Sequence, residues 1–284
     1  QMPVDIQAGK NLGKEKDMER KSLRILFFLK VLVLFPLCTK GELSKKKSLL
    51  FFFDKIEIKG DVDVFLVKGK RAREVTLFAD SEIIDSVYTK VRSKTLYIDA
   101  NNTYSLARRI PFIRINAERK YPVEIIVSTE NLKEIRLLDN ANLTIEKLST
   151  EKAFVFSESS GKLHIEDISA SQLNVIHTGA GDIILKGKDL AEINAKISGN
   201  GNLIASELET VRATLTHQGI GMVHLAPSVW LDARMLNTGN LFLHSKPSSL
   251  VIDQKGTGKV SDILPDAKAL YDLNATEPIL KTKP

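Results

Sequence analysis

The stretch Thr178-Gly-Ala-Gly-Asp-Ile183 decides the fold, because near-copies of it follow at a constant spacing. Ser198-Gly-Asn-Gly-Asn-Leu203 begins twenty residues later, and Gln218-Gly-Ile-Gly-Met-Val223 begins twenty residues after that. In each copy a Gly-x-Gly turn comes just before an aliphatic residue. A period of this length is typical of a solenoid or another stacked array. Each repeat is therefore expected to form one coil of a stack.

Weaker copies of the turn extend the repeat in both directions. The anchor positions are Ala141, Gly161, Gly181, Gly201, Gly221, Gly239 and Gly258, separated by 20, 20, 20, 20, 18 and 19 residues. Glycine suits a corner because the backbone there needs either a positive φ or a close approach to the next coil. The predicted structural turns are Gly161, Gly179, Gly181, Gly199, Gly201, Gly219, Gly221, Gly239, Gly256 and Gly258.

Aliphatic residues recur at fixed distances from the anchors. Two residues after them stand Leu143, Leu163, Ile183, Leu203, Val223, Leu241 and Val260, and four residues after them stand Ile145, Ile165, Leu185, Ala205, Leu225 and Leu243. Six residues before them stand Ile135, Val155, Val175, Ala195, Leu215 and Ala233. Positions two apart on a strand share a face, so these columns are predicted to point into the core. Each coil is expected to hold one strand before its turn and one after it.

A different, β-rich section precedes the repeats. Alternating apolar and polar residues predict strands over 53–58, 62–67, 74–78, 95–98 and 122–127, with a short helix over 81–87 and a looser stretch over 101–120. The predicted fold class is all-β. It is a β-solenoid of about 20-residue coils with Gly-x-Gly corners over 131–262, preceded by an N-terminal β-rich section over 51–130 packed on it. Residues 263–284 are a C-terminal tail, in which 264–271 is expected to make a helical turn or two.

The net charge of the chain is confined to its N-terminal segment. Residues 1–50 contain 11 Lys and Arg and 5 Asp and Glu, a balance of +6, whereas the remaining 234 residues contain 30 basic and 30 acidic groups. The pI of about 9.2 therefore describes a leader and not a binding surface, and no nucleic-acid partner is expected.

The N-terminal segment has the composition of a targeting signal. Residues 1–17 are expected to be a non-native or disordered extension, and 18–44 a signal peptide or N-terminal anchor, because a basic stretch precedes a 13-residue apolar run over 25–37. Cys38 is the only cysteine, so no disulfide forms within the chain. Three alternatives stay open: lipidation of Cys38, cleavage near residues 38–44, or an uncleaved anchor. Membrane association is expected only through this segment.

The turns themselves do not predict a ligand site. A calcium β-roll needs a shorter period with a carboxylate in each turn, whereas Lys162 and Lys259 occupy the position after the anchor. A phosphate-binding loop needs a following helix, whose amides and dipole attract the anion. Nucleophile, CxxC, HExxH and Walker motifs are absent from the sequence. We therefore predict no catalytic, cofactor-binding or metal-binding residues.

Two pairs of histidines lie in shared columns. His177 and His217 are two coils apart, and His164 and His224 are three coils apart. At a strand spacing of about 4.8 Å, neither pair can share one zinc ion, whose bonds to nitrogen are near 2.0 Å. We expect surface or edge histidines.

Charged residues suggest two further hypotheses. Glu146 and Glu166 stack in one column and are expected to form a solvent-facing ladder of mixed charge, although paired acids also cleave glycans in some β-helices. A basic patch with aromatic neighbours is expected to lie on a solvated loop, with binding of an anionic ligand as the alternative. The patch consists of Arg108, Arg109, Arg114, Arg119 and Lys120.

The chain resembles the bacterial family described as the putative auto-transporter adhesin head, or GIN, domain. That family opens with a Phe-Asp-x-Ile-x-Val strand and an Asp-Val pair, which are similar to Phe53-Asp-Lys-Ile-Glu-Ile58 and Asp63-Val64. It continues with repeated Ser-Gly-x-Gly turns, of which Ser198-Gly-Asn-Gly201 is a full match. The resemblance covers about residues 51–262 and implies an exported β-helical domain, without implying catalytic or binding residues.

These observations predict an exported, non-enzymatic envelope protein with a rigid β-solenoid surface and an adhesin-like or scaffold role. The alternative is a glycan-binding or glycan-cleaving β-helix protein of the envelope. The expected partner is an envelope or surface protein or a glycan, and self-association into a homo-oligomer is a further hypothesis. The expected location is the periplasm, the outer membrane or the cell surface of a Gram-negative bacterium.

Overall fold

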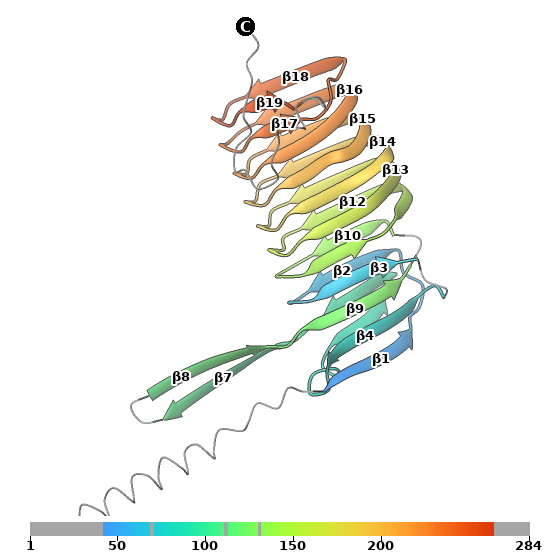
Figure 1. Ribbon diagram of the computed structural model, residues 1–284, viewed down its shortest axis with the longest axis vertical. Helices are drawn as coiled ribbons and strands as arrows, with labels where there is room; N and C mark the ends of the chain where they lie inside the picture. Colours follow the sequence, from blue (N-terminus) through green and yellow to red (C-terminus); the bar gives the residue numbers. More distant parts are fainter. Residues whose placement is uncertain (1–41, 69–70, 111–112, 130–131, 264–284) are drawn as a thin grey trace, which may run out of the picture. The chain divides into compact units, whose positions relative to one another are not determined.

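The computed structural model describes residues 42–68, 71–110, 113–129 and 132–263. Its central part is a stack of parallel strands, β12 (Leu148–Ser157), β13 (Leu163–His177), β14 (Ile183–Ile197), β15 (Leu203–His217) and β16 (Val223–Met235), shown in Figure 1. Shorter strands begin and end the stack: β10 (Glu134–Leu137), β11 (Asn142–Ile145), β17 (Leu241–Leu243), β18 (Ser249–Gln254) and β19 (Val260–Asp262). The predicted β-solenoid with about 20-residue coils is confirmed.

Each full coil differs from the prediction in one respect. The two expected strands of a coil join into one strand of 13 to 15 residues that runs from one glycine corner to the next. Midway along, neighbouring strands change register, for example between Ile165 and Ser169 of β13. This change of register forms a second bend in each coil, in addition to the glycine corner. Gly187 lies at the second bend of β14 and has a φ of 152°. A side chain there would collide with the backbone of Ile168 on the preceding coil.

The inward columns predicted from the repeat form the core. Leu163, Ile183, Leu203 and Val223 stand opposite one another in successive coils and are fully buried. The columns four residues after and six residues before the anchors are buried as well, and only Val260 in the last coil is partly exposed. Burying one such side chain stabilises the fold by roughly 1.5–3 kcal/mol. Because aliphatic side chains of successive coils pack on one another, each coil stabilises its neighbour.

The corner glycines are explained by the close approach of successive coils. A Cβ atom built on Gly201 would fall within 3.0 Å of the carbonyl group of residue 181 and of the imidazole of His177. A positive φ is not the reason, because among the described glycines only Gly60 and Gly187 have one. Of the two predicted reasons, close approach is correct for the corners.

Side-chain amides and carboxylates one residue after the anchors form a ladder of hydrogen bonds between successive glycine corners. The Oδ1 atom of Asn142 accepts the backbone N–H of Lys162 at 2.7 Å, and Oδ1 of Asn202 accepts that of Met222, also at 2.7 Å. Nδ2 of Asn202 in turn donates to Oδ1 of Asp182 at 2.8 Å. In four coils the residue after the anchor thus accepts a backbone N–H of the next coil; these residues are Asn142, Asp182, Asn202 and Asn240.

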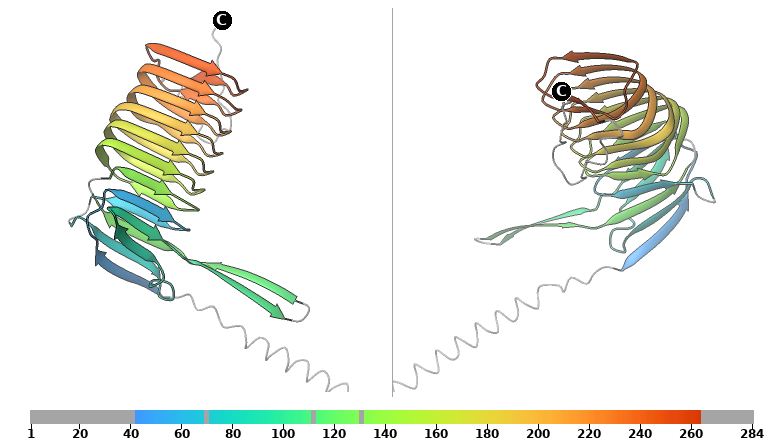
Figure 2. Two further views of the ribbon diagram at one scale, coloured as in Figure 1. Left: turned by 180° about the vertical axis from the view of Figure 1, so that it is seen from behind. Right: turned by 45° about the horizontal axis from the view of Figure 1, so that its top comes forward.

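The N-terminal section continues the stack and then closes it. Strands β2 (Lys55–Lys59) and β3 (Asp63–Val67) pair in parallel with β10 and β11, and β6 (Thr95–Asp99) and β9 (Val123–Ser128) extend the same two ladders. Strands β4 (Glu74–Asp80), β5 (Tyr88–Arg92) and β1 (Leu43–Leu49) then pair antiparallel, as Figures 1 and 2 show. The parallel repeat therefore ends in an antiparallel cap.

Two predictions for this section are wrong. Residues 81–86 form turns and not a helix: Ile83 and Ile84 both donate to the carbonyl of Asp80. The side chains of Ile83 and Val87 are nevertheless buried. The looser stretch over 101–120 is a hairpin of β7 (Thr103–Ile110) and β8 (Ile113–Lys120), which pair only with each other.

Some expectations fall outside the described residues. These are the extension over 1–17, the targeting segment up to residue 41 with Cys38, and the helical turn over 264–271. Within the described part of the chain, no helix is long and apolar enough to cross a membrane.

Candidate functional site

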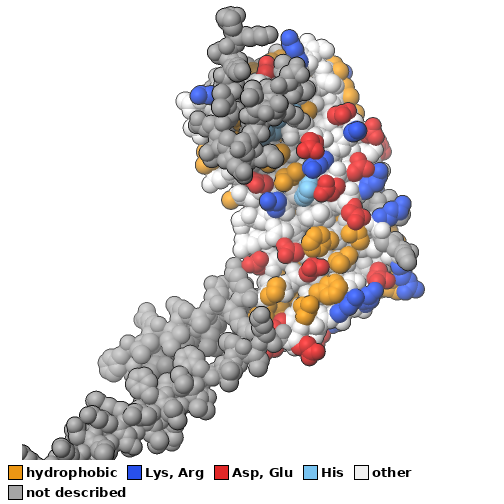
Figure 3. All heavy atoms as spheres, in the orientation of Figure 1, with side chains coloured by type: hydrophobic (Ala, Val, Ile, Leu, Met, Phe, Trp, Pro, Cys, Tyr) orange, Lys and Arg blue, Asp and Glu red, His pale blue; other side chains and the backbone are white. Residues whose placement is uncertain are grey.

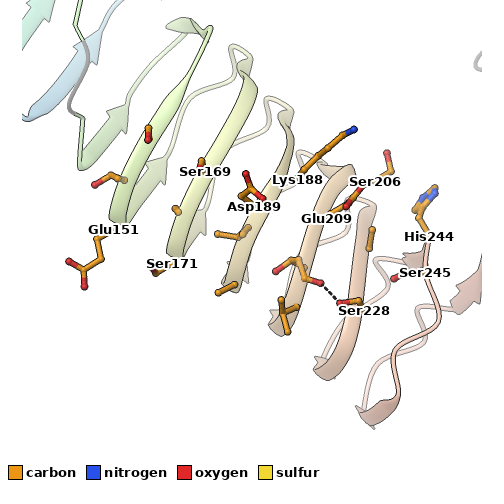
Figure 4. A pocket seen from close by; sticks show the side chains of 18 residues that line it. Glu151, Ser169, Ser171, Lys188, Asp189, Ser206, Glu209, Ser228, His244 and Ser245 are labelled. Carbon is orange, nitrogen blue, oxygen red and sulfur yellow. Dashed lines mark hydrogen bonds between the residues drawn. The ribbon is translucent and has the colours of Figure 1, made fainter.

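An open groove of about 1070 Å³ runs along the solenoid over the second bend of each coil. We call it the solenoid groove. Three rows of residues form it, each row taking one residue from each successive coil (Figure 4). The floor is Thr150, Ala170, Leu190 and Thr210, the first wall is Ser149, Ser169, Asp189, Glu209 and Ala226, and the second wall is Glu151, Ser171, Ala191, Val211 and Ser228. Lys188, Ser206, His244 and Ser245 complete it.

The floor follows from the strand register. Thr150 pairs with Ala170, Ala170 with Leu190, and Leu190 with Thr210. The last three are buried, so their neighbours on either side point outward by the alternation of a strand. The floor is also held by hydrogen bonds, since the hydroxyl of Ser228 donates to the carbonyl of Thr210 at 3.1 Å. The groove is thus a property of the rigid stack.

The first wall is polar and acidic. Its coil-by-coil order is hydroxyl, hydroxyl, carboxylate, carboxylate, from Ser149 and Ser169 to Asp189 and Glu209. The carboxylates of Glu151, Asp189 and Glu209 form no ion pair with any described residue. Elsewhere on the solenoid, acidic and basic side chains are intermixed, as the face in Figure 3 shows. With these three acids and one lysine, Lys188, the lining has an excess of negative charge.

The second wall changes character along the groove. It is polar at Glu151 and Ser171 and aliphatic at Ala191 and Val211. The side chain of Val211 is 43% exposed, and the neighbouring Val229 is 44% exposed. In its C-terminal half the groove therefore has an acidic wall facing an aliphatic one.

A pair of histidines lies at the C-terminal end of the groove. Nδ1 of His224 is 2.9 Å from Nε2 of His244, and the ring of His224 stacks on Phe242 with centroids 4.8 Å apart. Burial, with a smaller contribution from His244, lowers the pKa of His224 to about 4. The ring of His224 is therefore neutral at pH 7.

The prediction of surface or edge histidines is wrong for His224 and for both histidines of the other column. His177 and His217 are fully buried. Nδ1 of His177 contacts the carbonyl of Ser157 at 3.3 Å, and Nε2 of His217 contacts that of Gly221 at 2.9 Å. Each ring fills the space that a corner glycine of the next coil leaves open. Burial lowers the pKa of His177.

The paired acids Glu146 and Glu166 do not line the groove. Glu146 accepts the backbone N–H of Lys68 at 3.0 Å. Glu166 lies 3.9 Å from the Nζ atom of Lys186, which is 3.7 Å from Glu207. These residues form a ladder of mixed charge on the outside of the coils.

The sequence suggested that the basic patch lies on a solvated loop, but it lies on the β7–β8 hairpin. The register places Arg109 opposite Arg114 and Arg119 opposite Tyr104. Arg108 stands opposite Ile115, and Lys120 opposite Thr103. The backbone therefore brings the five basic residues onto one two-stranded ribbon.

Sequence reasoning missed the groove and the His224–His244 pair. The first wall could have been found from the repeat, because Ser149, Ser169, Asp189 and Glu209 all stand eight residues after an anchor. Searching that column for polar residues would have revealed this wall. The described residues hold no group of three or more His, Cys, Asp or Glu side chains that could bind a metal ion.

Comparison with known proteins gives a family and a fold. Residues 52–247 match the family model described as "Putative auto-transporter adhesin, head GIN domain". A crystal structure of a putative adhesin from Bacteroides fragilis is 19% identical with a TM-score of 0.68, and the alignment covers 79% of this chain and 98% of that chain. A putative lipid binding protein from Parabacteroides distasonis has 16% identity and a TM-score of 0.58 over 79% and 98% of the two chains.

A third similar structure is a putative adhesin from Parabacteroides merdae, with 18% identity and a TM-score of 0.52 over 79% of this chain and 97% of that chain. At these identities the likeness shows the shared fold. No functionally curated protein matches the chain significantly.

Proposed function

Because the chain belongs to the auto-transporter adhesin head GIN domain family, we propose that it is an exported, non-enzymatic protein of the bacterial envelope. In this proposal the solenoid is a rigid, adhesin-like surface, and the solenoid groove is the part of that surface that binds the partner. The observation that carries the proposal is the continuous groove across successive coils, whose walls come from a stack that does not need to rearrange. Rigid surfaces lose little conformational entropy on binding.

The chemistry of the groove supports binding over catalysis. Retaining and inverting glycosidases hold two carboxyl groups on opposite sides of the bond they cleave. Here Asp189 and Glu209 stand on the same wall, in successive coils, and the aliphatic Ala191 and Val211 face them. No acid faces them from the second wall in those coils. We therefore propose recognition without cleavage.

The location is tested by adding protease to intact cells. Digestion of the protein on whole cells supports a contact role at the surface. Protection until the outer membrane is opened contradicts that role and favours a periplasmic scaffold.

The contact itself is tested with purified protein and two matched variants. Ala191→Arg places a long side chain in the groove, and Ala180→Arg places the same side chain at the glycine corner; both alanines are exposed. We expect Ala191→Arg to abolish attachment to whole cells or purified envelopes and Ala180→Arg to retain it. Equal attachment by both variants contradicts the proposed contact.

A further inference from the structure

We infer that the solenoid groove binds a linear polysaccharide that carries no acidic groups, laid along the solenoid axis across the coils. The inference rests on the proposed function, because it names the ligand class of the same groove. Four properties of the described residues support it: the spacing of the rows, the chemistry of the two walls, the charge, and the direction of the strands.

The spacing suits a sugar chain. Each wall residue repeats once per coil, and coils are separated by the strand spacing of about 4.8 Å. One pyranose residue of a linear polysaccharide has a similar length. The row Ser149, Ser169, Asp189, Glu209 can therefore offer one hydrogen-bonding group to each successive sugar. Hydroxyl and carboxylate oxygens both accept hydrogen bonds from sugar hydroxyls.

The two walls match the two sides of a pyranose ring. A sugar has hydroxyl groups at its edges and C–H groups on its faces. Asp189 and Glu209 supply acceptors on one wall, while Ala191 and Val211 supply exposed apolar surface on the other. A ligand that is polar on one side and apolar on the other satisfies both walls together.

The charge of the groove selects against acidic polymers. Glu151, Asp189 and Glu209 have no ion-pair partner among the described residues, and Lys188 is the single lysine in the lining. A polyanion would face these carboxylates at short range, where like charges repel even with solvent screening. A neutral chain avoids this repulsion, and a chain bearing amino groups gains attraction.

The strand direction disfavours an extended peptide. Peptides add to a sheet along an open strand edge, where backbone groups are unpaired. The groove instead crosses β12 to β16 and follows no open strand edge, because each of these strands pairs with its neighbours along the stack. A peptide laid across the strands would also advance by about 3.3 Å per residue, out of step with the coils.

The test uses three hexasaccharides of matched length in calorimetric titrations at physiological salt: a glucosamine hexamer, its N-acetylated form, and a galacturonate hexamer. We expect the first two to bind and the galacturonate hexamer not to bind. The double variant Asp189→Asn/Glu209→Gln should weaken binding of the glucosamine hexamer about tenfold, from two lost exposed charge contacts. Binding of the N-acetylated hexamer should change much less.

Glu158→Gln is the matched control, because it removes an exposed carboxylate outside the groove. It should leave all affinities unchanged. Unaltered urea midpoints will show that the variants remain folded, as expected for substitutions at exposed positions.

Several outcomes would overturn the inference. Tightest binding of the galacturonate hexamer would contradict the charge argument. A lysine hexapeptide titrated under the same conditions serves as the peptide probe, and if it binds most tightly the groove is a peptide site. Sugar binding that Ala191→Arg leaves intact would place the glycan elsewhere. If no hexasaccharide binds but Ala191→Arg still abolishes attachment to cells, the ligand class is wrong and the proposed contact stands. If the parent does not attach either, both fail.

Discussion

Acidification is expected to destabilise the C-terminal coils through one buried side chain, His224. Only 9% of this residue is exposed, and its ring lies between Phe242 and His244. Burial, and to a lesser extent His244, lowers the pKa of His224 from 6.5 to about 4. Between these two values the unfolded chain binds a proton that the folded chain does not, so stability falls as the pH falls.

The magnitude follows from the size of the shift. A difference of about 2.5 pKa units corresponds to roughly 3 kcal/mol. This stability is fully present above pH 6.5 and is lost progressively down to about pH 4. The loss is a large fraction of the 5–15 kcal/mol typical of a folded domain.

The assay compares urea denaturation of the parent and of His224→Phe at several pH values between 8 and 4. Phenylalanine keeps a stacked ring against Phe242 and cannot be protonated. The buried His177 is present in both proteins, so its contribution cancels. We expect the parent to lose about 3 kcal/mol more than the variant between pH 7 and 4. Parallel stability curves over that range would refute the reasoning.

Three further predictions concern the stack itself. Gly201→Ala should destabilise the protein by at least about 2 kcal/mol, because its Cβ would overlap the carbonyl group of Gly181; a urea midpoint equal to the parent's would contradict the close-approach explanation. Asn202→Ala should cost about 1–2 kcal/mol in the same measurement, since it breaks the hydrogen bonds to Asp182 and to the backbone of Met222. Glu134→Gln should cost about 0.5–1 kcal/mol at pH 7 by removing ion pairs to two basic neighbours. Those neighbours lower the pKa of Glu134, so its contribution is present at neutral pH and disappears as the pH falls below the ordinary range of a carboxyl group; a difference that persists at pH 3 would argue against it.

Most of the solenoid could be predicted because the same sequence pattern recurs in every coil. The same aliphatic columns occur in six or seven coils, so a substitution such as Ala141 for glycine at one anchor does not obscure the period. The reason for glycine at the corners could not be predicted in the same way. Whether Gly201 serves a positive φ or a close approach depends on the distance to the previous coil, which is a tertiary property.

Strand β1 of the cap was harder to predict because it lacks an alternating pattern. β1 contains Lys45, Lys46 and Lys47 in succession and is almost entirely exposed. Lysines on an edge strand discourage further pairing, yet they also hide the strand from a search for apolar alternation. The hairpin of β7 and β8 was missed because strands with several arginines resemble a solvated loop in composition.

The candidate site was missed because the column eight residues after each anchor was not searched for polar residues. The row that contains Asp189 and Glu209 keeps its place in the coil but changes its residue type from serine to acid. The pair of His224 and His244 is concealed for another reason. Its members stand three and five residues after their anchors, and only the register of the bend brings them together.

Because the repeat has a fixed length, the groove can become longer or shorter only by whole coils. Duplicating or deleting one twenty-residue coil, such as the one that carries Asp189, would lengthen or shorten the groove by about 4.8 Å and leave both ends as they were. Selection for longer or shorter ligands can therefore act by copying or losing a segment of the gene. The antiparallel cap at one end would keep its own sequence through such changes, and relatives would differ in reach while sharing the same chemistry.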